Sequence, residues 1–107
     1  TSGAFTDTLD AGQSVSHPVV VKAGTADLSV RSSWPLGRFK VTFTSPKGLQ
    51  YAVAGTFPGG AVLTEGGTFT TFSVPKPKAG TWTVTITALE GTPRGRVTTQ
   101  LDTPARA

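Results

Sequence analysis

The stretch that decides the fold is Thr81-Trp82-Thr83-Val84-Thr85-Ile86-Thr87. Polar and apolar residues alternate along it without a break, and successive side chains of a β-strand point to opposite faces of a sheet. Thr, Val and Ile also have branched Cβ atoms, which fit a pleated strand better than a helix. We therefore predict a half-buried strand in which Trp82, Val84 and Ile86 face the core and the threonines face solvent.

Short apolar runs of the same kind recur along the chain, bounded by Gly, Pro and Asp. The clearest cover residues 26–33, 38–45, 68–74 and 97–101. No stretch carries the 3.6-residue spacing of apolar side chains that an amphipathic helix needs. About eight short strands with short connections are typical of an antiparallel β-sandwich of the jelly-roll or immunoglobulin-like type. We therefore predict an all-β fold, with residues 1–107 as a single β-sandwich domain.

Two of these runs form the clearest pair. Residues 26–33 and residues 38–45 each place alternate apolar side chains on one face. If the residues between them are the loop of a hairpin, Val30 faces Val41 and both inward patterns agree. We therefore predict a β-hairpin here.

The same alternation gives two further expectations. Leu49, Tyr51 and Val53 share one face, so we expect them in the core with the Tyr51 hydroxyl at the surface. In residues 68–74 the apolar spacing slips by one position, and a β-bulge near Thr70 would reconcile it.

Composition narrows the class of protein. The 107 residues include no Cys, no Met and no Asn, and Ile occurs only at position 86. Without Cys there is no disulfide, no thiolate metal site and no thiol catalysis. Because the chain starts at Thr1 without Met, we expect a fragment of a longer polypeptide. The scarcity of Asn and Ile suggests a GC-rich bacterial source.

The charge pattern bears on partners. The net charge of +4 comes from ten scattered Lys and Arg residues and six acidic residues. Because the basic residues form no run, we expect no nucleic-acid partner. No apolar run approaches the roughly 18 residues of a membrane-spanning helix, so we expect no membrane span. The positive surplus favours an anionic polymer or an acidic protein surface over a cationic one.

Residues for catalysis are scarce. The one histidine, His17, precedes Pro18, which lacks the N–H that an interior strand needs, so we place it on an exposed edge strand. Ser16 then points to the opposite face and is out of reach as a nucleophile. No pair of acidic residues has a spacing that marks acid–base chemistry. We expect no enzyme activity and no cofactor, although a structural calcium bound by Asp7 and Asp10 stays open.

Four residues are candidates for ligand binding: Trp34, Arg31, Arg38 and Lys40. Trp34 precedes a proline in a loop, where its indole is either exposed and able to stack on a sugar ring, or folded over the end of the sandwich. In the predicted hairpin Arg31 faces Lys40, and Arg38 lies close by. This basic cluster would bind an anionic polymer or an acidic partner surface, or it would protect a sheet edge from aggregation.

Several segments resemble a known family. They are Ala26-Asp27-Leu28-Ser29-Val30-Arg31, Trp34, residues 39–48 with their Ser45-Pro46-Lys47-Gly48 turn, Pro75, and residues 79–86. These segments resemble the bacterial pre-peptidase C-terminal domain, and they are similar to the P domain of subtilisin-like proprotein convertases. The resemblance implies a jelly-roll-like, non-catalytic sandwich appended to a secreted hydrolase or adhesin. Where the family often has an acidic strand, this chain has Arg38-Phe39-Lys40-Val41, so a calcium role tied to those carboxylates does not carry over.

The leading interpretation is an extracellular, non-catalytic accessory domain of a secreted bacterial hydrolase. It would support folding, dock on the catalytic domain of the parent protein, or attach that protein to a substrate or surface. The alternatives are a carbohydrate-binding module that holds a polysaccharide through Trp34, and an enzyme fragment completed by another chain. An exposed apolar surface would favour docking. A groove lined with exposed aromatic rings would favour sugar binding.

Overall fold

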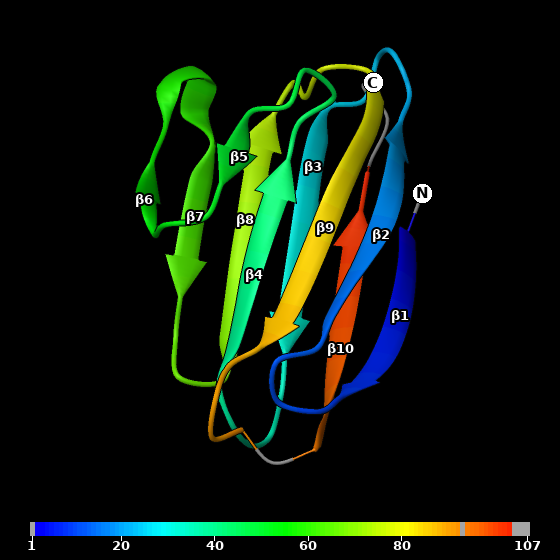
Figure 1. The fold of residues 1–107 in the computed structure, drawn as a ribbon. Helices are drawn as coiled ribbons and strands as arrows, with labels where there is room; N and C mark the ends of the chain where they lie inside the picture. The colour runs from blue at the N-terminus through cyan, green and yellow to red at the C-terminus, as the bar shows by residue number, and fades with distance from the viewer. Residues whose placement is uncertain (1, 93, 104–107) are drawn as a thin grey trace.

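The computed structural model describes residues 2–92 and 94–103 and is all-β, as predicted, with two antiparallel sheets packed face to face (Figure 1). The six-stranded sheet consists, in spatial order, of β1 (Ser2–Leu9), β10 (Gly95–Asp102), β3 (Asp27–Ser33), β8 (Phe69–Pro75), β7 (Val62–Glu65) and β6 (Gly55–Thr56). The four-stranded sheet consists of β2 (Ser14–Val21), β9 (Gly80–Ala88), β4 (Phe39–Thr44) and β5 (Gln50–Tyr51). A short 3-10 turn, Pro58–Gly60, joins β6 to β7.

The core lies between the sheets and is built from alternate residues of each strand. In β9 the side chains of Trp82, Val84 and Ile86 are buried, which confirms the prediction made from their alternation. Phe43 of β4 stacks on Phe72 of β8 across the core, with ring centroids 4.5 Å apart. Apolar side chains from both sheets therefore interdigitate in one cluster.

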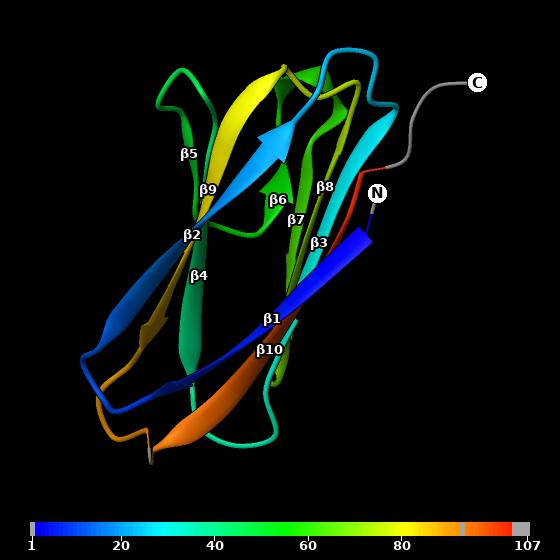
Figure 2. The same ribbon diagram turned by 90° about the vertical axis from the view of Figure 1, so that its right-hand side faces the viewer.

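The predicted hairpin between residues 26–33 and 38–45 is wrong. β3 pairs with β8 and β10 in the six-stranded sheet, whereas β4 pairs with β9 and β5 in the four-stranded sheet. The connection between them therefore crosses from one sheet to the other, at the lower end of the molecule in Figure 2. Two strands that face each other across a sandwich bury the same alternate positions as two strands paired within one sheet. Alternation alone does not distinguish these arrangements.

The predicted bulge in residues 68–74 is also wrong. The register between β3 and β8 is continuous along the whole length of β8. Thr70 is 2% exposed and faces the core, while Phe69 lies on the outer face of the sheet. There the guanidinium of Arg31 lies 4.8 Å from the centroid of the Phe69 ring. A cation–π contact, rather than the core, therefore accommodates this aromatic ring.

Residues 49–53 are only partly as predicted. Tyr51 is half-buried and packs against Phe57 and Phe72, with ring centroids 5.0 Å apart in each pair. Leu49 and Val53, however, are 63% and 70% exposed, so their predicted core positions are wrong. The reason is that β5 is only two residues long, and the chain leaves the sheet on both sides of Tyr51.

Candidate functional site

Trp34, the candidate for stacking on a sugar, lies inside the molecule. Trp34 is only 5% exposed, and its ring centroid lies 5.2 Å from the ring centroid of Phe39. The indole Nε1–H donates a 3.1 Å hydrogen bond to the carbonyl oxygen of Gly37. Of the two placements predicted for Trp34, the structure therefore shows the one in which the indole folds over the end of the sandwich, and the exposed placement is wrong.

The basic cluster of Arg31, Arg38 and Lys40 does not form as predicted. Arg31 lies on β3, on the outer face of the six-stranded sheet, where it contacts Phe69. Lys40 lies on β4, in the other sheet. Because the chain crosses between sheets after β3, the two residues are not cross-strand neighbours.

Three of the four candidates nevertheless line one small cavity. Trp34, Arg38 and Lys40 surround a space of about 240 Å³ together with Glu65. The Lys40 Nζ lies 3.0 Å from a Glu65 carboxylate oxygen and also donates to the carbonyl oxygen of Ala52. This ion pair joins β4 to β7 across one open side of the sandwich. Because Glu65 offsets the Lys40 charge and Arg31 lies elsewhere, Arg38 is the one basic residue of the predicted cluster that lines this cavity without an ion pair to Glu65.

A hydrogen-bonded histidine–aspartate pair joins the sheets at the opposite side, between β1 and β2. The His17 Nε2 lies 2.9 Å from one carboxylate oxygen of Asp7 and 3.0 Å from the other. The Phe5 ring stacks on the imidazole, with centroids 3.8 Å apart. We call Phe5, Asp7 and His17 the edge clasp. β2 is an edge strand, as predicted, but the exposed position of His17 is wrong, since its side chain is only 26% exposed.

The edge clasp places the His17 imidazole beside the Asp7 carboxylate, but the neighbouring hydroxyl on β2, that of Ser16, is not part of it. Ser16 points to the outer face, as predicted, and its Oγ lies 3.0 Å from the Thr85 hydroxyl oxygen. A nucleophilic triad needs the hydroxyl within hydrogen-bond reach of the imidazole. The geometry of the clasp therefore fits a structural link between two sheet edges.

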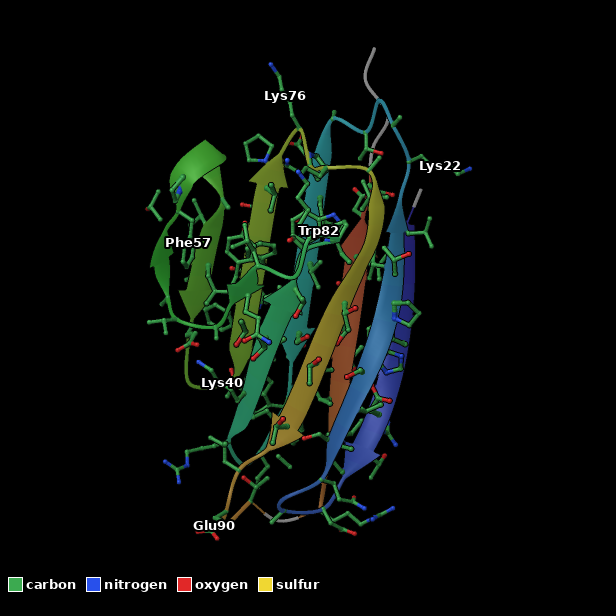
Figure 3. The ribbon with its side chains drawn as sticks, turned by 45° about the horizontal axis from the view of Figure 1, so that its top comes forward. Lys22, Lys40, Phe57, Lys76, Trp82 and Glu90 are labelled. Carbon is green, nitrogen blue, oxygen red and sulfur yellow. The ribbon has the colours of Figure 1, made fainter. Side chains whose placement is uncertain are left out.

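Sequence reasoning missed a cavity at the other end of the sandwich from Trp34. It has a volume of about 190 Å³ and lies between the β4–β5 turn, the 3-10 turn and the β8–β9 connection. Lys47, Lys76 and Lys78 stand around it, and Figure 3 shows Lys76 reaching out from this end of the molecule. Its apolar wall comprises Leu49, Pro58, Val74, Pro75, Pro77 and Trp82. We call this cavity, with its three lysines, the lysine pocket.

Hydrogen bonds fix the turns that carry the pocket residues. The Ser45 Oγ accepts hydrogen bonds from the backbone N–H groups of Lys47 and Leu49, at 3.3 and 3.1 Å. The Trp82 Nε1–H donates a 2.9 Å hydrogen bond to the carbonyl oxygen of Lys78. Two of the three lysines therefore extend from backbone that side-chain hydrogen bonds hold in place.

Lys76 has an unusual backbone conformation. Its φ of 46° lies in the left-handed region, and it is the one non-glycine residue at positive φ in the part of the chain that the structure describes. Its backbone N–H donates a 2.8 Å hydrogen bond to the carbonyl oxygen of Ala26. A lysine here costs of order 1 kcal/mol, and strained positions of this kind cluster at functional sites.

Lys47 and Lys78 bring like charges together. A hydrogen bond with the Lys47 side chain, then charge repulsion from it, and then desolvation lower the pKa of Lys78 from its usual 10.5. Within residues 2–92 and 94–103, the ion pairs that form involve none of the three pocket lysines. An anion bound between Lys47 and Lys78 would relieve their repulsion.

The two carboxylates considered for calcium each have a side-chain partner instead. Asp7 accepts a hydrogen bond from the His17 ring, whether or not that ring carries a charge, and a carboxylate oxygen of Asp10 lies 2.8 Å from a guanidinium nitrogen of the cationic Arg94. Among the described residues, no three His, Cys, Asp or Glu side chains gather as they would around a metal ion. Over those same residues, no helix has the length and apolar character needed to cross a membrane.

Comparisons with known proteins establish the fold without establishing a family. No family model matches the sequence, and no curated protein matches it either, so the resemblance to the pre-peptidase C-terminal domain is not confirmed. Among solved structures, the chain is similar to a Bacillus licheniformis lipase in its propeptide form, with a TM-score of 0.62 and 16% sequence identity. The match covers 96% of this chain and 22% of the lipase chain. This chain therefore has the fold of a segment that makes up about a fifth of that lipase chain.

Proposed function

We propose that this chain is a non-catalytic accessory domain of a secreted bacterial hydrolase, and that it docks on the catalytic domain and supports its folding. The lysine pocket carries the proposal. Leu49, at 63% exposed, and a largely apolar wall lie inside a rim of three lysines. An apolar centre with a polar rim is the usual anatomy of a surface that binds another protein.

The likeness to a lipase in its propeptide form supports the hydrolase part of the proposal. In that protein, a segment with the same fold belongs to a chain almost five times as long, since it accounts for 22% of the total. A sandwich of this kind on a hydrolase chain has the catalytic domain as its nearest available partner. Sugar binding, the alternative predicted from the sequence, loses its anchor because Trp34 is 5% exposed and presents no free ring face.

The test compares the full-length polypeptide that carries residues 1–107 with a version from which they are deleted. We expect the deletion to lower the yield of active hydrolase after refolding from denaturant. We also expect the separate domain, added during refolding, to restore part of that yield. An unrelated β-sandwich of similar size, fused in place of residues 1–107, is the control for a general solubilising effect. Equal yield and activity with and without these residues would contradict the proposal, as would a full-length polypeptide without a hydrolase domain.

A further inference from the structure

We propose that the lysine pocket binds an acidic peptide segment that inserts one apolar side chain into the cavity and places its carboxylates against the lysines. The site itself is argued from the pocket alone. Its natural occupant, an acidic segment of the polypeptide that carries this domain, rests on the proposed function. The pocket offers two separate features for recognition, a charge arrangement and an apolar cavity, and a ligand has to satisfy both.

The charge arrangement favours an anionic partner. Lys47, Lys76 and Lys78 surround one cavity, and Lys22 lies at the same end of the molecule, opposite the end where Glu90 lies (Figure 3). Asp27 is opposite Pro75 in the register of β3 and β8, and Pro75 directly precedes Lys76 in the sequence. Even so, no ion pair in the described residues joins Asp27 to a lysine. The lysines are therefore available to carboxylates from another chain segment.

The size of the cavity favours a side chain over a free small molecule. Its volume of about 190 Å³ lies below the roughly 300–1,000 Å³ of pockets that enclose drug-sized ligands. The wall is formed by proline rings, Leu49, Val74 and the Trp82 ring, which match an aliphatic or aromatic group. One apolar residue between acidic neighbours would fill this space while its backbone runs past the lysines.

The walls are held rigidly by two close backbone contacts. Gly80 has a φ of 132°, and a Cβ there would lie 2.9 Å from the Pro46 Cβ. Gly60 has a φ of 84°, and a Cβ there would lie 3.0 Å from the Pro75 Cγ. The β4–β5 turn and the 3-10 turn therefore pack tightly against the ends of β9 and β8. A pocket preformed in this way loses little conformational entropy on binding.

Other anionic ligands fit the pocket less well. Inorganic phosphate would engage the lysines and leave the apolar wall exposed to water. Nucleic acid is bound through a series of phosphate contacts along a continuous basic track, whereas these lysines surround one cavity. An acidic peptide is the ligand class that uses both features of the site.

Binding is measured by fluorescence anisotropy with a fluorescently labelled peptide of sequence Glu-Asp-Phe-Asp-Glu, at low salt. We expect the triple variant Lys47→Gln, Lys76→Gln, Lys78→Gln to bind about tenfold more weakly than the wild type or worse, because each lysine–carboxylate pair contributes a modest share. Lys22→Gln is the matched control. It removes an exposed lysine at the same end but outside the pocket, so we expect less than about a twofold change.

The apolar part of the site is tested separately. We expect the probe to lose about tenfold in affinity when its Phe is replaced by Ser, because burial of an apolar side chain is removed. Leu49→Ser in the domain should weaken binding of the original probe in the same direction. Val20 is also strongly exposed (68%) but does not line the pocket, so Val20→Ser is the control for a general loss of surface hydrophobicity. Circular dichroism and thermal unfolding establish that each variant is folded.

Four results would overturn the site. They are an unchanged affinity in the triple variant, an equal loss of affinity in Lys22→Gln, equal binding of a peptide with Gln in place of its acidic residues, and displacement of the probe by inorganic phosphate at similar concentrations.

Whether the natural occupant is a segment of the same polypeptide is tested in the full-length protein. If the deletion of residues 1–107 impairs refolding and the triple variant does not, the accessory function stands and the assigned occupant is wrong. If the probe binds at the pocket and the deletion has no effect, the binding site stands and the accessory function fails.

Discussion

His17 on β2 and Asp7 on β1 are hydrogen-bonded to each other across two strands that belong to different sheets. The His17 Nε2 lies 2.9 Å from a carboxylate oxygen of Asp7, and the Asp7 side chain is only 14% exposed. Among the strands that the structure describes, β1 pairs with β10 alone and β2 pairs with β9 alone, so each is the edge of its sheet. The edge clasp therefore joins the two sheet edges at one side of the sandwich, and Lys40 and Glu65 join β4 to β7 towards the other side.

We predict that His17→Ala lowers the free energy of unfolding by about 1–3 kcal/mol, because it leaves the largely buried Asp7 carboxylate without its hydrogen-bond partner. The Lys40–Glu65 pair is the control. Both of its side chains are 38% exposed, so we expect Lys40→Ala to cost less, about 0–1 kcal/mol for the ion pair. Urea denaturation of both variants measures the difference. A smaller loss in His17→Ala than in Lys40→Ala would contradict this ranking.

Trp34→Ala should destabilise the domain by about 3–5 kcal/mol, since it removes a buried ring and leaves a cavity at the end of the sandwich. Trp34→Phe keeps most of the ring volume and loses the hydrogen bond to Gly37, so a smaller loss of about 1–2 kcal/mol is expected. Chemical denaturation measures both. If Trp34→Ala unfolded at the same denaturant concentration as the wild type, the buried position of Trp34 would be refuted. Because of this expected instability, loss of ligand binding in Trp34→Ala would not identify a sugar site.

Gly80→Ala should lower the free energy of unfolding by about 1–3 kcal/mol. The alanine would be forced into a backbone conformation with positive φ, and its Cβ would clash with Pro46. Gly48→Ala is the matched control. Gly48 has a φ of 90°, but nothing lies within 4 Å of a Cβ placed there, so only the backbone strain of about 1 kcal/mol applies. The two variants are compared by thermal and urea unfolding. Equal losses would show that the contact between Gly80 and Pro46 adds nothing to the cost.

Lys47→Gln should raise the pKa of Lys78 towards its usual 10.5, because it removes the hydrogen bond and the repelling charge that lower it. A pH titration of the lysine side-chain NMR signals measures this change. The lowered pKa means that the folded chain binds fewer protons at Lys78 than the unfolded chain. Stability should therefore rise with pH from the lowered value up to about 10.5, and rise less in Lys47→Gln. An unchanged Lys78 titration in the variant would refute the coupling.

The fold class could be predicted because alternation reports which face of a strand is buried. The strand at residues 81–87 shows this most clearly, and its core positions were all correct. The partner of each strand could not be predicted in the same way. Val30 and Val41 both face the core, but they do so from opposite sheets, and only the three-dimensional path of the chain after Ser33 decides that.

For the functional residues, too, the sequence predicts which side chains face the core but not which distant segments come together. Asp7 and His17 carry a signal in the sequence, since each falls in phase with buried apolar neighbours of its own strand, Leu9 and Val19. A charged residue on the core face of an edge strand predicts a partner across the gap. The lysine pocket has no such signal, because its parts come from three turns that are far apart in the chain, around residues 47, 58 and 77.

The strand order also fixes when the domain can fold during synthesis. Within this domain β1 and β2 precede all the other strands, yet their partners among the described residues, β10 and β9, are the last two strands of the domain to be made. As the chain leaves the ribosome, its first two strands remain unpaired until residues 80–102 have emerged. Pairings this distant in sequence close slowly, and unpaired strands are prone to aggregate in the meantime. Until residues 80–102 have been made, this domain exposes unpaired strands to which a molecular chaperone could bind.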